Sequence, residues 1–439
     1  MGKLFDLQAE YNREKLSRFH TPGHSGCGAA IPPLAPILPL DVTEVEAFDS
    51  LYHASGALAD LERRLAGVFG TKATLISAGG CTLAIQAMLA LAVPQGGKVL
   101  IGRNAHRSAL NTIALLDLKP SWLYPANGAV ITADEVAQGI AENPDAAAVY
   151  LTSPNYYGQL CDIQAIAAVA HAHGIPLLVD NAHGSHLGLL RENLHPIHLG
   201  ADMTACSIHK TLPVLTGGAL LNIANADFVP RAKEKMALFG STSPSYLTMA
   251  SIDLLCDRLE GDFAAAYTKP EQQVAALRSY AQQAGFHLLE GACDPVRFTL
   301  PTGSNGFTGD TAYQAFRAAG AVAEYFDDRA IVFILTPFHE AKDFDRLQAG
   351  IAALGERRGA PCAPLCPPPK NRQICTVREA VFAKSEAVAL QDAIGRVAAD
   401  SVTPCPPGIP VLIPGEEVTP DMQTYLKNCG ISQIRVMTE

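Results

Sequence analysis

Short apolar runs of β type alternate with helical runs along the chain from about residue 70. Adjacent parallel strands need such helical crossovers, because a tight turn can join only antiparallel strands. The expected strands lie at 73–76, 98–101, 147–151, 176–179, Ala205 and 219–221, with helices at 83–92, 108–118 and 163–173. The alternation predicts an open α/β sheet that is largely parallel and covered by helices on both faces.

The pattern changes after about residue 255. A helical stretch over 263–284 leads to strands expected at 296–300 and 331–335, which favours a second, smaller α+β domain. A Pro-rich stretch then reads as an extended linker. The predicted division is an N-terminal segment 1–50, a large α/β domain 51–255, a small domain 256–360, a linker 361–375 and a C-terminal unit 376–439.

Composition and charge narrow the class of protein. Of the 439 residues, 48% are hydrophobic and only 17% are charged, which indicates a compact globular protein; the formal net charge of −10 argues against nucleic acid as a partner. No apolar run is long enough to span a bilayer, and the polar N-terminus is unlike a secretory signal. The eleven scattered cysteines lack the paired spacing of a zinc site and are typical of reduced thiols. We therefore expect a cytoplasmic protein with no metal site and no membrane partner.

Polar side chains follow the ends of several expected strands. Ser77, Ser153, Asp180 and Ser207 each lie just past an apolar run. In open α/β sheets the carboxyl ends of the strands form the binding crevice. These four positions predict a ligand site at that edge of the sheet.

Lys210 and Asp180 are the most informative pair of residues. Taken alone, Lys210 is more simply interpreted as a solvated surface lysine, and Asp180 as a turn residue or helix cap. Together, after strands of an α/β sheet, they meet the needs of a pyridoxal 5'-phosphate (PLP) enzyme. Such an enzyme uses a lysine amine that bonds to the cofactor aldehyde and a carboxylate that keeps the pyridine nitrogen protonated. We therefore expect PLP as the cofactor, with Lys210 and Asp180 as catalytic residues.

Two loops after strands could hold other parts of this cofactor. The turn at Gly80, Cys81 and Thr82 precedes a helix and could cradle the phosphate with backbone N–H groups, although an ordinary tight turn fits it equally well. His106 could lie flat on the pyridine ring, or it could be a surface histidine near a helix start. Both loops become cofactor candidates once Lys210 is considered.

Three residues near the catalytic pair complete the candidate site. His183 could contact the phenolic oxygen of the cofactor or the carboxylate of the substrate, and it joins the catalytic set. Ser207 and His209 could hydrogen-bond the phosphate while Lys210 turns inward.

Longer segments carry a resemblance to a known family. They are 19–24, 49–51 with His53, 103–108, 152–158, 180–184, 207–215, 243–247, 406–410 and 414–416. Over nearly its whole length the chain resembles the bacterial ornithine, lysine and arginine decarboxylases, which are fold-type I PLP enzymes. The resemblance implies an aminotransferase-like α/β fold, with a mainly parallel seven-stranded sheet in the large domain and a smaller α+β C-terminal domain.

The same resemblance implies how the site is assembled. It implies cofactor roles for Lys210, Asp180, His106, His183, Ser207 and His209. It also implies a homodimer or a larger assembly with the active site at the subunit interface, where Ser241 to Ser243 reach the phosphate of the neighbouring subunit. The short chain is similar to the compact form of the family, which lacks an N-terminal wing domain.

The sequence departs from the family pattern at several positions. Ser25 stands where a lysine is usual, Asn181 replaces the acidic residue after Asp180, and Cys405 replaces an aromatic residue. The phosphate turn also differs, since it reads Gly-Gly-Cys-Thr. These departures bear on the substrate and on the phosphate contacts, and they leave Lys210 and Asp180 in place.

The expected reaction is decarboxylation of a basic amino acid. Lys210 or His183 would return a proton to Cα. A distal cation needs an acidic partner, for which Glu324, Asp327 and Glu416 are candidates, although each of the three reads more simply as an ordinary surface carboxylate. Arg297 is a candidate for the α-carboxylate. The alternatives are an aminotransferase or β-eliminating lyase on the same fold, a non-catalytic paralogue, and an α/β protein without a cofactor.

Overall fold

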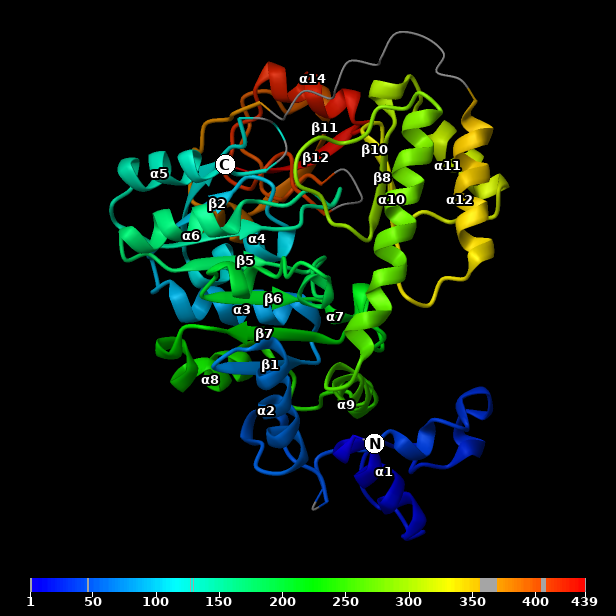
Figure 1. Ribbon diagram of the computed structural model, residues 1–439. Coiled ribbons are helices and arrows are strands. Elements are labelled where there is room, and N and C mark those ends of the chain that lie inside the picture. Colours follow the sequence, from blue (N-terminus) through cyan, green and yellow to red (C-terminus); the bar gives the residue numbers. More distant parts are fainter. Residues whose placement is uncertain are drawn as a thin grey trace. The chain divides into compact units, whose positions relative to one another are not determined.

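The computed structural model describes residues 2–45, 47–126, 128, 130–355, 369–403 and 408–438. The chain forms two compact units, Met1–Ala92 with Pro176–Lys269 and Val93–Ile175 with Pro270–Glu439. Its main sheet has seven strands in the order β1-β7-β6-β5-β4-β2-β3 (Figure 1). This confirms the predicted α/β class and the mainly parallel seven-stranded sheet.

The first unit contributes four buried strands to this sheet. They are β1 (Ala73–Ser77), β5 (Leu177–Asp180), β6 (Met203–Cys206) and β7 (Ala219–Ile223). β5 and β6 pair in parallel, whereas β7 is antiparallel to both β6 and β1. Almost every side chain of these strands is buried, which explains why the sequence shows continuous apolar runs and not an alternating pattern.

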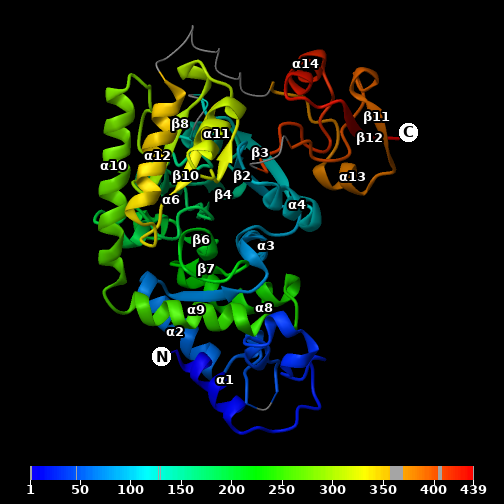
Figure 2. The same ribbon diagram turned by 90° about the vertical axis from the view of Figure 1, so that its right-hand side faces the viewer.

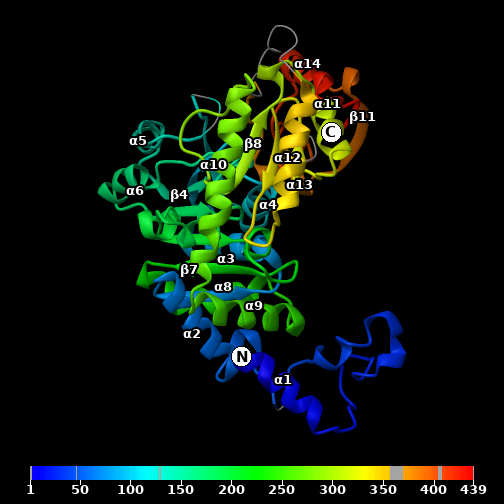
Figure 3. The ribbon, with the colours of Figure 1, turned by 45° about the vertical axis from the view of Figure 1, so that its right-hand side comes forward.

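The helices of the first unit cover its strands. They are α1 (Lys3–Arg13), α2 (Ala57–Phe69), α3 (Gly80–Ala92), the short α7 (Ile208–Thr211), α8 (Val229–Phe239) and α9 (Tyr246–Leu259). α2 ends at Gly70, whose φ of +62° is a left-handed conformation that favours glycine. Helices α1, α2 and α9 pack against one another (Figure 3).

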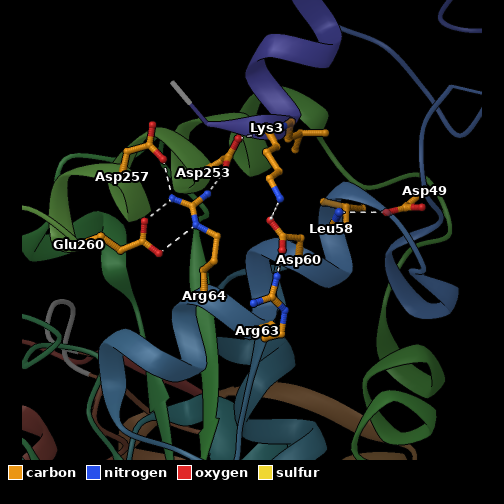
Figure 4. A network of polar contacts seen from close by, with 10 residues as sticks. Lys3, Asp49, Leu58, Asp60, Arg63, Arg64, Asp253, Asp257 and Glu260 are labelled. Atoms are coloured by element: carbon orange, nitrogen blue, oxygen red, sulfur yellow. Dashed lines mark hydrogen bonds and ion pairs between the residues drawn. The ribbon is translucent and has the colours of Figure 1, made fainter.

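Ionic contacts reinforce this helix cluster. Arg64 of α2 pairs with two carboxylates of α9, at 3.2 Å to Asp253 and 2.5 Å to Asp257, and with Glu260 directly after that helix at 2.7 Å (Figure 4). The second oxygen of Asp253 accepts hydrogen bonds from the backbone N–H groups of Leu4 and Phe5 at the start of α1. The buried Asp253 therefore links three helices that are far apart in the sequence.

The second unit contributes the other three strands. They are β2 (Lys98–Gly102), β3 (Lys119–Leu123) and β4 (Ala146–Thr152), and β2 pairs in parallel with both β3 and β4. The accompanying helices are α4 (Arg107–Leu116), α5 (Ala133–Glu142) and α6 (Ile163–Ala172). The sequence did not predict β3, because Pro120 and Ser121 interrupt any apolar run. As β3 is last in the strand order, it tolerates a proline there.

A smaller α+β layer lies in the same unit. The antiparallel strands β8 (Arg297–Pro301), β10 (Ala330–Ile334) and β9 (Tyr325–Phe326) form a three-stranded sheet in that order. The helices are α10 (Thr268–Gln283), α11 (Gly309–Ala318) and α12 (Ala341–Leu354), and α11 and α12 pack side by side next to β10 (Figure 2). Phe298, Phe316 and Ile351 lie in their shared core.

The C-terminal part of the chain has its own small core. It comprises α13 (Val377–Phe382), the antiparallel pair β11 (Ser385–Ala389) and β12 (Gln433–Met437), and α14 (Pro420–Asn428). Residues 361–368 of the expected linker and Cys405 lie outside the described residues. The domain boundaries given above remain a prediction.

Candidate active site

Lys210 lies beside His183 at the carboxyl ends of two neighbouring strands. Its Nζ is 2.9 Å from His183 Nε2. Lys210 belongs to α7, the single helical turn that follows β6, and His183 lies in the loop that follows β5. Because β5 and β6 are parallel and adjacent, their loops emerge at the same edge of the sheet. The fold thus brings together two residues that are 27 positions apart.

Asp180 is a buried carboxylate at the same edge. It is the last residue of β5, it is 2% exposed, and its Oδ1 accepts a hydrogen bond of 3.1 Å from the Ala182 N–H. Burial of a carboxylate is costly unless partners stabilise its charge. A cationic ring nitrogen is one such partner, so the position suits the expected role.

Cys81 lies within electrostatic reach of Asp180 and Lys210. Burial is the main reason that the pKa of the Cys81 thiol lies well above its usual value, and the charge of Asp180 adds to the rise. A hydrogen bond with Ser207 and the charge of Lys210 oppose that rise. The turn after β1, the end of β5 and the turn after β6 therefore belong to one cluster.

The turn after β1 leads directly into a helix. Ser77 Oγ donates a 2.7 Å hydrogen bond to the carbonyl of Gly80, and the Gly80 N–H donates to the carbonyl of Gly217 at 3.1 Å. Gly80 has a φ of +70°, and a Cβ added there would meet no atom within 4 Å. Cys81 and Thr82 follow in the first turn of α3. The space beside the Cα of Gly80 is thus open, next to a helix start that could favour an anion.

The remaining predicted residues of this unit lie close to Lys210 in sequence or on the surface. Ser207 is buried and precedes α7. His209 is half-buried, and burial together with the charge of Lys210 lowers its pKa. Ser243 is exposed, and its N–H donates to Ser241 Oγ at 3.1 Å. Its reach to a neighbouring subunit stays a prediction.

His106, in the second unit, caps helix α4. Its Nδ1 accepts a 3.2 Å hydrogen bond from the Ser108 N–H and lies 2.9 Å from Ser108 Oγ. The ring is partly buried. His106 is therefore a helix cap with a partly buried ring, and its stacking on the cofactor stays a prediction.

Arg297 is a buried cation that already has several partners. It is 1% exposed, and burial lowers its pKa. Its Nη1 donates to the carbonyls of Asn155 and Tyr156, at 3.4 and 3.2 Å, and its Nε lies 3.6 Å from Asp294 Oδ2. These contacts fix the direction of the guanidinium.

The three candidate acids lie in different environments. Glu324 is exposed, and its Oε1 accepts a 3.4 Å hydrogen bond from the Tyr156 hydroxyl. Asp327 accepts two hydrogen bonds, of 2.6 and 2.7 Å, from tyrosine hydroxyls. Glu416 is 1% exposed and 3.5 Å from Arg103, so it is not a surface carboxylate, and burial raises its pKa against the charge of Arg103.

Two family models match the chain: Orn/Lys/Arg decarboxylase, major domain, over residues 3–277, and Orn/Lys/Arg decarboxylase, C-terminal domain, over residues 367–433. The chain belongs to the Orn/Lys/Arg decarboxylase family. It is therefore a decarboxylase, as the resemblance in the sequence predicted.

Individual relatives agree with this assignment. The arginine decarboxylase of Bacillus subtilis (strain 168) is 28% identical to this decarboxylase, over 93% of this chain and 89% of the relative. The solved Francisella novicida lysine decarboxylase LdcF matches with a TM-score of 0.82 at 18% identity, over 100% of this chain and 81% of that one. A structure of SPT with PLP matches with a TM-score of 0.55 at 15% identity, over 68% of this chain and 77% of that one. The structural matches show that the decarboxylase has the fold-type I architecture.

Some residues around the site of this decarboxylase were not identified from its sequence. A buried network behind Asp180 joins Cys206 Sγ to Asn181 Oδ1 at 3.4 Å and to His195 Nε2 at 3.6 Å. Arg103 belongs to the motif at 103–108, and its guanidinium donates to the carbonyls of Pro410 and Val411. No local pattern marks such contacts, because their partners lie far away in the sequence.

Neither a membrane-crossing helix nor a metal cluster is found in the described part of the decarboxylase. None of its described helices combines the length and hydrophobicity needed to traverse a bilayer. Within the same residues, no group of three or more His, Cys, Asp or Glu side chains could hold a metal ion.

Proposed function

We propose that this decarboxylase uses PLP to convert lysine, arginine or ornithine into the corresponding amine and carbon dioxide. The observation that carries the proposal is the 2.9 Å contact between Lys210 and His183, at the strand edge where the buried Asp180 lies. Membership of the family supports the reaction type. The names of the relatives make arginine and lysine the first substrates to test.

The residues present fit PLP at its three recognition points. An amine, a buried carboxylate and the start of a helix occur in one unit of the chain, at Lys210, Asp180 and Gly80. When bound, PLP supplies an aldehyde that bonds to amines and a protonated ring that withdraws electrons from Cα of the substrate. Lys210 would hold the aldehyde carbon, and Asp180 would keep the proton on the ring nitrogen.

The other cofactor residues would fix the orientation of the ring and its phosphate. The backbone N–H groups of Cys81 and Thr82, with Ser207 and His209, would bind the phosphate at the start of α3. Gly80 would shape this turn without donating to the phosphate, because its own N–H already donates to the Gly217 carbonyl. His106 would stack on the ring. With the ring held in this way, the Cα–carboxylate bond of the substrate can be set perpendicular to the ring plane.

Lys210 and His183 are the candidate proton donors to Cα. Loss of carbon dioxide leaves an electron pair that a proton must capture, and a donor must lie within reach of that carbon. At 2.9 Å the two side chains can pass a proton between Nζ and Nε2. Either residue, or the two in succession, can therefore return the proton.

Recognition of a basic substrate needs an anionic side chain for its distal cation and a cationic side chain for its α-carboxylate. Glu324 suits the first role better than Glu416 or Asp327, because it is exposed whereas the other two already have several partners. Arg297 remains the candidate for the α-carboxylate. Charge-assisted pairs of this kind are among the stronger polar contacts in proteins.

The assembly and the location of the protein form part of the proposal. We expect a cytoplasmic homodimer or larger homo-oligomer, with the active site at the subunit interface and Ser243 reaching the phosphate of the neighbouring subunit. No nucleic acid or membrane partner is proposed.

The deciding experiment measures products from a panel of amino acids. Purified protein with PLP should release carbon dioxide and one amine from lysine, arginine or ornithine. Lys210→Ala should lose both turnover and the visible absorption band of the bound cofactor. Formation of a keto acid without carbon dioxide, or release of a β-substituent, would replace this proposal by the aminotransferase or the β-eliminating lyase.

A further inference from the structure

The loop that carries His106 is in direct contact with a glycine near the C-terminus. The Arg107 N–H donates a 3.0 Å hydrogen bond to the carbonyl of Gly408. A Cβ added to Gly408 would lie 2.8 Å from His106 Nε2 and 2.9 Å from Cδ2, closer than real Cβ atoms approach. Gly408 also has a φ of +76°. One edge of the imidazole therefore lies against Gly408, and any larger residue at this position would displace the imidazole.

The opposite edge of the imidazole is held by its own helix. His106 Nδ1 accepts the Ser108 N–H and lies 2.9 Å from Ser108 Oγ. A ring with Nδ1 bonded on one side and Nε2 near Gly408 on the other has little freedom to rotate. The plane of the ring is thus set by contacts from two distant parts of the chain.

A buried ion pair fixes the segment that contains Gly408. The guanidinium of Arg103 donates to the carbonyls of Pro410 at 2.6 Å and Val411 at 2.9 Å, and it lies 3.5 Å from Glu416 Oε2. The same Oε2 accepts the Ile413 N–H at 2.9 Å. Arg103 and Glu416 are 5% and 1% exposed. Arg103 therefore anchors the segment 408–416, and Arg103 lies on the same loop as His106, three residues before it.

We infer that the segment 408–416 of the C-terminal part positions His106 for stacking on the cofactor ring. Gly408, Arg103 and Glu416 are positioning residues in this inference, which rests on the proposed PLP role of His106. The C-terminal part then contributes to cofactor binding indirectly, through the position of His106, and its own charged side chains need not touch the cofactor.

The test substitutes one glycine and compares it with a matched glycine. Gly408→Ala adds a Cβ that displaces the imidazole. Gly395→Ala is the control, because Gly395 has a φ of +77° and its added Cβ would meet nothing within 4 Å. Both variants share the backbone strain of alanine at positive φ, and only the first contacts His106.

The readouts are the dissociation constant of PLP for the full chain, its visible absorption band and the melting temperature. Gly408→Ala should weaken PLP binding roughly tenfold, the effect of losing one aromatic stacking contact, and should shift the band. Gly395→Ala should bind PLP as the wild type does. In a His106→Ala background, Gly408→Ala should cause no additional loss.

The outcomes separate the inference from the proposed function. If the wild type binds PLP and His106→Ala weakens binding, but Gly408→Ala behaves like Gly395→Ala, the positioning inference is overturned and the function stands. If the wild type binds no PLP, both fail. Should Gly408→Ala not fold, Glu416→Gln tests the same anchor: we expect a weaker PLP affinity, and an unchanged affinity overturns the inference.

Discussion

Asp180 is the residue whose chemistry can be tested most directly. Asp180→Asn keeps the size of the side chain and removes the charge that, in the proposed function, would hold a proton on the ring nitrogen. We expect PLP to bind still, while turnover falls by about 100-fold to 1,000-fold, the usual effect of losing one preorganised electrostatic contact. Steady-state rates, with PLP absorbance as the binding measure, check this.

The control for Asp180 is another aspartate that follows a strand of the sheet. Asp162 lies in the loop after β4 and caps α6 by accepting the Ala165 N–H at 3.0 Å. Asp162→Asn should leave turnover unchanged. Wild-type turnover in Asp180→Asn would remove the assigned role.

At the level of elements, Arg64 should matter far more than its neighbour Arg63. Arg64→Ala leaves Asp253, whose side chain is 1% exposed, without its cationic partner. We expect the free energy of unfolding to fall by about 2–3 kcal/mol. This is less than the loss expected for a fully buried ion pair, because Arg64 is partly exposed. Urea denaturation with a constant m-value measures the change.

Arg63 provides the matched control on the same helix. Its side chain is 73% exposed, and it pairs with Asp60 at the surface (Figure 4). Arg63→Ala should cost less than about 1 kcal/mol, as is usual for exposed ion pairs. Equal losses in the two variants would show that Asp253 does not depend on Arg64.

The buried His195 should make the fold sensitive to acid. It is fully buried, and burial together with His198 and His186 lowers its pKa to about 3, while Cys206 Sγ lies 3.6 Å from Nε2. The native state keeps His195 neutral, whereas the unfolded state takes up a proton below pH ~6.5. Its stability contribution is therefore present above pH ~6.5 and is lost as the pH falls toward 3, by about 2 kcal/mol at pH 5.

Unfolding experiments at pH 7 and pH 5 test this effect. His195→Asn keeps an acceptor for the Ile197 N–H. The free energy of unfolding that the protein loses between pH 7 and pH 5 should be smaller in this variant than in the wild type, by about 2 kcal/mol. The exposed His173 is the control, since His173→Asn should lose stability with pH as the wild type does. Identical pH dependence in His195→Asn and the wild type would contradict the assignment.

The elements themselves were predictable to different degrees. Buried strands such as β5 and β6 produce continuous apolar runs, so their sequence alone predicts them. The edge strand β3 contains Pro120 and is last in the strand order of the described residues, next to β2, so neither hydrophobicity nor propensity marks it. Its backbone hydrogen bonds to β2 create that strand, and a local pattern cannot show them.

For the whole molecule, the proposed interface active site requires association. Light scattering of the purified protein should give a mass of at least twice the 46.4 kDa of one chain. Ser243→Ala should weaken PLP binding in the assembled protein if this serine reaches the neighbouring phosphate. An active monomer would contradict both expectations.

The sequence by itself determined the class of fold and the family, and it predicted the central residues of the site. Strand and helix periodicity is local, and Lys210 and Asp180 follow strands whose ends must meet at one edge of a parallel sheet. Only the tertiary structure decided that Gly408 limits the space of His106, that Arg103 pairs with Glu416, and that His195 meets Cys206. The physical reason is that packing energies depend on distance in space, and the partners of the first two contacts are about 300 residues apart along the chain.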